Sequence, residues 1–192
     1  MKTKMVLGAA VLVLLLLASV AYELIWRRVN EEPTFFTKRP GAARLSVGQS
    51  APAFTLPRIG GGEYSLSEVK DKIILVNFWA SWCEPCTREF PSLLKLVQKL
   101  EGRVELVAIS IDSRKGDVEN FLKAFDGHGP YLSVLWDPAN RIAGLYGTDQ
   151  YPETYILDRD HRLVRKISGM EDWSRPDILF FLRHLAQIPT PD

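Results

Sequence analysis

The chain has little of several features that define whole classes of protein. Among its 192 residues there are only two cysteines and three histidines. A fold that depends on a framework of disulfides is therefore excluded. The formal net charge is +1, which argues against a strongly nucleic-acid-binding protein or one with an acidic tail. No internal repeat is visible, so the length favours one globular domain with extensions.

What the sequence does contain is a pair of cysteines, Cys83 and Cys86, spaced C-x-x-C. Structural zinc needs four ligands, and the sequence has neither a second C-x-x-C nor an H-x-x-x-H pair. A purely structural disulfide would close too short a loop to stabilise the fold much. Two inert core cysteines are a further alternative, which the tight spacing disfavours. The spacing is typical of a redox-active pair.

The motif stands between a predicted strand and a predicted helix. Residues 72–78 form a short apolar run rich in β-branched residues, which is typical of a buried strand. In residues 87–100 apolar residues recur at about helical spacing, and Pro85 is tolerated in a first helical turn. The free N–H groups and the positive dipole end of a helix start stabilise a thiolate. We therefore expect Cys83 to be exposed and nucleophilic, with Cys86 near enough to form a disulfide.

The N-terminal part of the chain predicts a membrane anchor. Residues 5–22 are apolar after a short basic start and, with the residues that follow, are about long enough to span a bilayer. We expect a signal anchor or transmembrane helix over residues 1–28, a tether over 29–46 and a globular domain over 47–188. A cleaved signal peptide is the alternative, because residues 19–21 fit a cleavage site. No cysteine lies near the end of the apolar run, which excludes a lipoprotein.

The globular part alternates predicted strands and helices. Residues 51–56 and 64–66 predict a hairpin across a glycine turn. The strands that follow are expected at residues 73–78, 104–111, 133–135, 154–157 and 163–167. The helices are expected at residues 84–100, 117–125, 140–146 and 175–185. This order predicts an α/β fold whose central mixed sheet has a parallel core, antiparallel edge strands and flanking helices.

The segment from Val76 to Pro91, with the sequence VNFWASWCEPCTREFP, resembles the thioredoxin superfamily. More narrowly, it resembles the membrane-anchored TlpA/ResA/CcmG (DsbE)-like thiol-disulfide oxidoreductases, and the resemblance covers residues 47–185. It implies a thioredoxin-like fold with an added N-terminal β-hairpin. Cys83 and Cys86 are then the catalytic pair, and their redox-active disulfide serves with no cofactor and no metal.

The resemblance also assigns the second half of the site. Members of the superfamily carry a cis-proline loop beside the disulfide, and Pro152 fits that loop by its position before a strand. An ordinary trans turn is the alternative. Such a loop exposes backbone groups that pair with an extended substrate segment. The substrate-binding residues expected on this basis are Trp82, Glu84, Pro85, Tyr151, Pro152 and Glu153. The remaining tryptophan of the motif, Trp79, is expected in the core.

Glu89 is the third expected catalytic residue. Many thioredoxins carry a buried aspartate on the strand before the motif, but the matching residue here is Asn77. Glu89 follows Cys86 by three residues, which places it on the same side of the helix. ResA-like proteins have a glutamate at this place that helps to set the thiol pKa values. We therefore expect Glu89 to accept the proton of Cys86 or to tune the pair electrostatically, with a solvated helix glutamate as the alternative.

The function that the resemblance implies is membrane-tethered, extracytoplasmic reduction of disulfides in apocytochrome c or a partner protein during cytochrome c maturation. The expected location is the bacterial inner membrane, with the domain facing the periplasm or the cell exterior. A membrane thiol transporter is expected to donate the electrons. We expect a single-pass monomer that binds no nucleic acid. The alternatives are a general periplasmic disulfide oxidase or isomerase, and a copper-binding chaperone on a thioredoxin-like fold.

Overall fold

The computed structural model describes residues 19–22, 44–100, 102–125 and 129–188. The chain divides into two compact units, Met1–Gly41 and Ala42–Asp192. Of the first unit only residues 19–22 are described, and they are helical. No helix within the described residues is long and apolar enough to cross a membrane. The expected anchor over residues 1–28 and most of the expected tether lie outside those residues.

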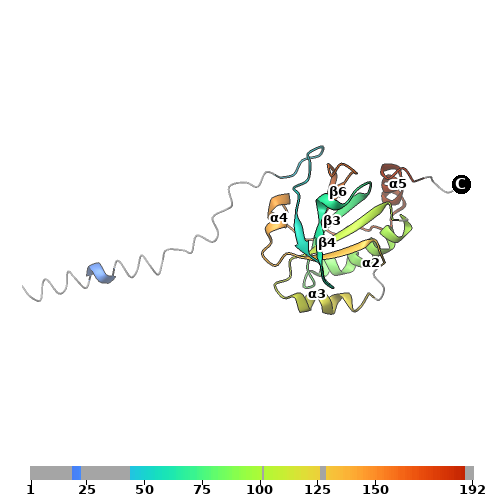
Figure 1. Ribbon diagram of the computed structural model, residues 1–192. Helices are drawn as coiled ribbons and strands as arrows, with labels where there is room; N and C mark the ends of the chain where they lie inside the picture. Colours follow the sequence, from blue (N-terminus) through green and yellow to red (C-terminus); the bar gives the residue numbers. More distant parts are fainter. Residues whose placement is uncertain (1–18, 23–43, 101, 126–128, 189–192) are drawn as a thin grey trace, which may run out of the picture. The chain divides into compact units, whose positions relative to one another are not determined.

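The second unit alternates strands and helices along the chain (Figure 1). The strands are β1 Thr55–Pro57, β2 Glu63–Ser65, β3 Ile73–Trp79, β4 Val104–Ser110, β5 Leu132–Trp136, β6 Glu153–Leu157 and β7 Leu163–Ser168. The α-helices are α2 Glu84–Lys99, α3 Lys115–Leu122, α4 Arg141–Tyr146 and α5 Pro176–Leu185, with the 3-10 helix η2 at Leu66–Glu68. Each strand and α-helix expected from residue 51 onward is present, with ends shifted by up to four residues.

The five-stranded sheet has the order β5-β4-β3-β6-β7. Strands β3, β4 and β5 are parallel, whereas β6 and β7 are antiparallel to their neighbours. Strands β1 and β2 form the expected hairpin as a separate antiparallel pair. Every residue of β3 and β4 is buried, because a parallel core is covered on both faces and needs continuous apolar runs. The mixed sheet predicted from the sequence is therefore confirmed.

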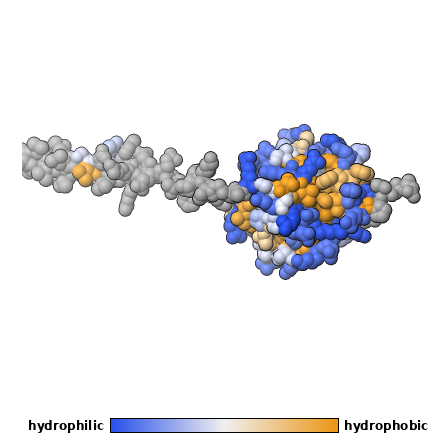
Figure 2. All heavy atoms as spheres, turned by 90° about the horizontal axis from the view of Figure 1, so that it is seen from above, coloured by the Kyte–Doolittle hydropathy of each residue, from blue (hydrophilic) through white to orange (hydrophobic). Residues whose placement is uncertain are grey.

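Side chains of β3 alternate between two hydrophobic cores. Leu75 and Trp79 belong to a core that helices α2, α3 and α5 complete on one face of the sheet. Val76 and Phe78 belong to a second core, which the β1–β2 hairpin and Tyr146 of α4 complete on the other face. The outer surface is largely hydrophilic, with hydrophobic residues gathered near the middle of the face that Figure 2 shows.

The connections that follow β3, β4 and β5 leave the sheet at the same end, because these three strands run in parallel. The connection into β6 arrives at that end, since β6 runs antiparallel to β3. In open α/β sheets, ligands bind outside the carboxyl ends of the strands. This end of the sheet, where α2 also begins, is the part of the fold that positions the site.

Candidate active site

The two cysteines lie at the start of α2 and form a disulfide, with their Cα atoms 5.2 Å apart. Cys83 is the N-cap residue of the helix, and its Sγ accepts a hydrogen bond from the backbone N of Cys86 at 3.3 Å. Pro85 stands in the first turn, as the sequence predicts. Cys83 is only 6% exposed, so the expectation of an exposed thiol is wrong for this oxidised state. The physical reason is that its sulfur is bonded to Cys86 and packs within the α2-side core.

Two aromatic rings flank the disulfide region. Trp82 is 67% exposed, and its ring lies edge-to-face with that of Tyr151, at a centroid distance of 6.5 Å. The Tyr151 hydroxyl donates to Asn140 Oδ1 at 3.0 Å. Burial raises the pKa of this hydroxyl, which keeps it neutral and able to donate. Trp82 therefore offers an exposed apolar surface beside a fixed aromatic neighbour, whereas Trp79 is fully buried as expected.

Pro152 follows a cis peptide bond with Tyr151, which confirms the expected cis-proline. Glu153, the next residue, pairs with Phe78 of β3. This register places Pro152 at the end of β3 from which the C-x-x-C segment continues. The Pro152 carbonyl accepts a hydrogen bond from Gly169 N at 2.9 Å, so the loop is tied to the chain that leaves β7.

The Glu153 side chain lies inside the domain rather than at the surface. It is 1% exposed, and its Oε1 lies 2.8 Å from Lys166 Nζ and 2.7 Å from Ser168 Oγ. Its Oε2 accepts a hydrogen bond from the Tyr155 hydroxyl at 3.1 Å. The alternation of β6 turns this carboxylate to the face opposite α2. The side chain of Glu153, which is expected to bind substrate, is therefore buried and already engaged within the fold.

Glu84 is the most exposed acidic group of the motif. Its side chain is 81% exposed and lies 3.9 Å from Arg88, one turn further along the helix. An exposed ion pair of this kind contributes little to stability. The carboxylate of Glu84 is therefore free to meet a partner at the surface.

Glu89 is a buried residue of α2, with 3% of its surface exposed, so the alternative of a solvated helix glutamate is wrong. Asn77 Nδ2 donates to its Oε1 at 3.2 Å, and the backbone N of Glu171 donates to its Oε2 at 3.0 Å. Trp173 Nε1 donates to the same Oε2 at 3.4 Å. Burial raises the pKa of the Glu89 carboxyl from 4.5 to about 7, against these three hydrogen bonds, which lower it. The group can therefore take or give a proton near neutral pH.

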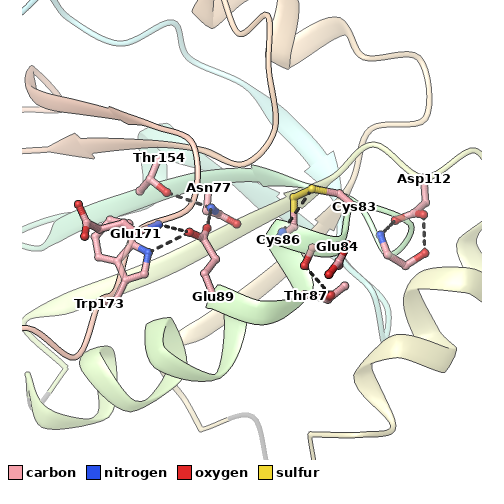
Figure 3. Close-up of a disulfide and its surroundings, with 11 residues drawn as sticks. Asn77, Cys83, Glu84, Cys86, Thr87, Glu89, Asp112, Thr154, Glu171 and Trp173 are labelled. Carbon is pink, nitrogen blue, oxygen red and sulfur yellow. Dashed lines mark hydrogen bonds between the residues drawn. A yellow bond between two sulfur atoms is a disulfide. The ribbon is translucent and has the colours of Figure 1, made fainter.

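Sequence reasoning missed most of the residues that hold Glu89. Figure 3 shows Asn77, Thr154, Glu171 and Trp173 gathered around its carboxylate on one side of the disulfide. Asn77 also donates to Thr154 Oγ1 at 2.9 Å. The donors on the chain after β7 stand more than 80 residues from Glu89 along the sequence, and no local spacing connects them to the motif. The one local signal is Asn77, which stands where many thioredoxins have an aspartate and therefore indicates a different path for the proton.

This arrangement is suited to exchange between thiols and disulfides. A cysteine pair at a helix start provides an attacking sulfur and a resolving sulfur, and a nearby buried carboxyl with a pKa near 7 can move a proton. Among the described residues, no group of three or more His, Cys, Asp or Glu side chains is placed to hold a metal ion.

Known proteins share both the sequence and the fold. The AhpC/TSA family model matches residues 47–166. The thiol-disulfide oxidoreductase ResA of Geobacillus kaustophilus is 31% identical over 187 residues, which cover 96% of this chain and 96% of the relative. ResA of Geobacillus thermodenitrificans is 31% identical over 161 residues, covering 83% and 84% of the two chains.

Among solved structures, the chain is similar to a putative thiol:disulfide interchange protein DsbE from Chlorobium tepidum. The TM-score is 0.63 at 28% identity, covering 74% of this chain and 96% of that one. The fold is thioredoxin-like, as the resemblance implied. The chain therefore belongs to the AhpC/TSA family, and within it to the ResA-like thiol-disulfide oxidoreductases.

Proposed function

We propose that the protein is a membrane-tethered, extracytoplasmic reductase that reduces disulfides in apocytochrome c or a partner protein during cytochrome c maturation. The observation that carries the proposal is the buried Glu89, one helical turn after Cys86 and with a pKa of about 7. A reductant needs its second thiol to lose a proton at neutral pH, and this carboxyl is tuned to accept one. The relatives named thiol-disulfide oxidoreductase ResA support the exchange chemistry of this proposal.

The reaction begins with the reduced pair. The Cys83 thiolate attacks one sulfur of the substrate disulfide, so that a mixed disulfide forms and the other substrate sulfur leaves as a thiolate. Cys86 then loses its proton to Glu89, directly or through one water, and attacks Cys83 Sγ. The second substrate sulfur leaves and takes up a proton. The Cys83 thiolate and the Cys86 thiol have together given two electrons and one proton, and the substrate disulfide has become a dithiol once its first leaving thiolate has taken a proton from solvent.

Substrate binding would use the surface around the disulfide. Trp82 supplies an exposed apolar ring, and the loop at Pro152 supplies backbone groups for an extended segment. Glu84 adds an exposed negative charge at the helix start. A membrane thiol donor would return two electrons to the Cys83–Cys86 disulfide, and a tether would raise the effective concentration of the monomeric domain near membrane partners.

The reduction potential of the Cys83–Cys86 pair tests whether the protein is a reductant. It is measured on the full chain in detergent, by equilibration with glutathione buffers. A value near or below that of thioredoxin, about −270 mV, is expected. A value near about −120 mV, typical of a strong oxidant, would contradict the proposal and favour disulfide introduction.

The proposed location has a separate test. The globular domain should be digested by protease added to spheroplasts, because it would face the outside of the cytoplasmic membrane. Protection of the domain in intact spheroplasts, with digestion only after lysis, would contradict an extracytoplasmic position.

A further inference from the structure

A second buried carboxylate lies beside the disulfide, on the side away from Glu89 (Figure 3). Asp112 is 1% exposed and stands just beyond the end of β4. Its Oδ2 accepts hydrogen bonds from the backbone N of Ser81 at 3.0 Å and from Ser110 Oγ at 2.7 Å. Its Oδ1 accepts a hydrogen bond from Ser81 Oγ at 2.7 Å. Both oxygens of one carboxylate are therefore bonded to the same serine.

Ser81 belongs to the turn from which Cys83 is presented. The backbone N of Cys83 donates to the Ala80 carbonyl at 3.2 Å, so Ser81 and Trp82 are the two central residues of that turn. The side chain and the backbone of Ser81 are both held by Asp112. A two-point attachment of this kind fixes orientation as well as position, because rotation of the turn would break at least one bond.

Asp112 is itself held from two further directions. Its backbone N donates to Ser110 Oγ at 3.0 Å, and its carbonyl accepts from Trp136 Nε1 at 2.7 Å. Through its carboxylate and its backbone, Asp112 thus joins the turn after β3 to the last residues of β4 and β5, Ser110 and Trp136. A charged hydrogen-bonding group whose own position is fixed can transmit that position to the group it bonds.

We propose that Asp112 is a positioning residue for disulfide exchange, which holds Ser81 and thereby fixes Trp82 and Cys83 against an incoming substrate disulfide. The inference rests on the exchange reaction of this site and not on the identity of the physiological substrate. Attack on a disulfide requires the sulfur to lie in line with the bond that breaks, so a loosened turn costs rate even when the thiol remains intact.

The test is a double-mutant cycle on Ser81→Ala and Asp112→Asn, with insulin as the disulfide substrate. The readout is the second-order rate constant for reduction by the pre-reduced full chain in detergent. We expect Ser81→Ala to lower this constant about fivefold and Asp112→Asn about tenfold, within the range that misplacement of reacting groups produces. The double variant should lose less than the two single losses combined, because asparagine has one acceptor oxygen where Asp112 has two and no longer offers a separate oxygen to each donor of Ser81.

Two controls separate positioning from general stability. Ser81→Thr keeps the hydroxyl and should restore most of the rate that Ser81→Ala loses. Ser133→Ala removes another buried serine–carboxylate hydrogen bond, which Ser133 Oγ donates to Glu105 Oε1 at 2.8 Å. This bond is far from the disulfide, because it lies near the opposite ends of β4 and β5. The substitution should lower the free energy of unfolding in urea while leaving the rate constant at the wild-type value.

Three results would contradict the positioning role alone, and one would contradict the proposed function as well. Wild-type activity in Ser81→Ala, additive losses in the double variant, or an equal loss in Ser133→Ala would each overturn the positioning role of Asp112. Such a result would leave the proposed function standing. A wild-type protein that reduces no insulin would overturn both.

Discussion

Glu89 and Glu153 are both buried beside the central strand, but they lie on opposite faces of the sheet and are held differently. Glu89 faces α2 and accepts hydrogen bonds from neutral donors, the side chains of Asn77 and Trp173 and a backbone N–H. Glu153 faces the other core and has the ammonium group of Lys166 at 2.8 Å. The two residues are 3% and 1% exposed, so burial alone does not distinguish them.

The difference lies in the charge of the partner. Neutral donors stabilise the Glu89 carboxylate only in part, and desolvation raises its pKa to about 7. Burial of Lys166 by itself lowers the pKa of its ammonium group. The hydrogen bonds of that group to Glu153 and Tyr155 outweigh this effect, so the pKa of Lys166 is raised. An ammonium with a raised pKa remains charged at neutral pH and neutralises its partner. One buried glutamate can therefore exchange protons, and the other serves as part of a fixed ion pair.

The largest expected effect is the pH dependence of stability that Glu89 produces. Its pKa in the folded state, about 7, lies above its ordinary value of 4.5, so the folded state binds this proton more tightly. The contribution to stability is fully present below about pH 4.5 and is lost as the pH rises to about 7. The loss should be about 3 kcal/mol. Urea unfolding of the oxidised protein between pH 4 and pH 8 measures it.

The control for this measurement is Glu89→Gln, which should flatten the dependence in that pH window. If Glu89→Gln kept the full wild-type slope, the titrating group would be another residue and the contrast between the two glutamates would fail.

The next effect is on the reaction itself. Glu89→Gln removes the proton acceptor for Cys86, so release of substrate from the mixed disulfide should slow about 100-fold at neutral pH. The first attack, by Cys83, should change much less. Stopped-flow measurement of the two phases separates these steps. Glu105→Gln, which alters a buried carboxylate remote from the disulfide, is the matched control and should leave both phases unchanged.

A smaller effect is expected from breaking the ion pair on the other face. Lys166→Met leaves the Glu153 carboxylate buried without its cation and should lower the free energy of unfolding by about 2 kcal/mol. This is less than for a fully buried pair, because the Lys166 side chain is 23% exposed. Adding Glu153→Gln to Lys166→Met should recover part of the loss. A larger loss in the double variant would show that Glu153 is not destabilised by losing its partner.

The smallest effect concerns the indole that reaches Glu89. Trp173→Phe removes a hydrogen bond of 3.4 Å that lowers the pKa of Glu89. The midpoint of the pH-dependent stability change should therefore move up by about 0.5 pH unit. The same substitution at Trp136, which bonds Asp112 and not Glu89, should leave that midpoint in place. A downward shift in Trp173→Phe would contradict the account of how this carboxyl is held.

The sequence predicts the position of the Glu89 side chain correctly but not that of Glu153. The spacing to Cys86 within one helix predicts the position of Glu89, and the structure buries it on the side expected. The place of Glu153 after Pro152 predicts a substrate-facing residue, but the strand pairing of Phe78 with Glu153 turns its side chain into the second core. A shift of one residue in that register would reverse the faces of β6, and no local pattern fixes the register.

The sequence by itself determined the C-x-x-C pair, its place between a buried strand and a helix, and the alternating order of the fold. These features depend on residues close together in the chain, where periodicity and spacing carry the information. Only the tertiary structure decided which groups surround the disulfide. The Asp112–Ser81 contact, the Trp173–Glu89 contact and the Lys166–Glu153 pair join separate elements, so they exist only once the strands have paired and the helices have packed.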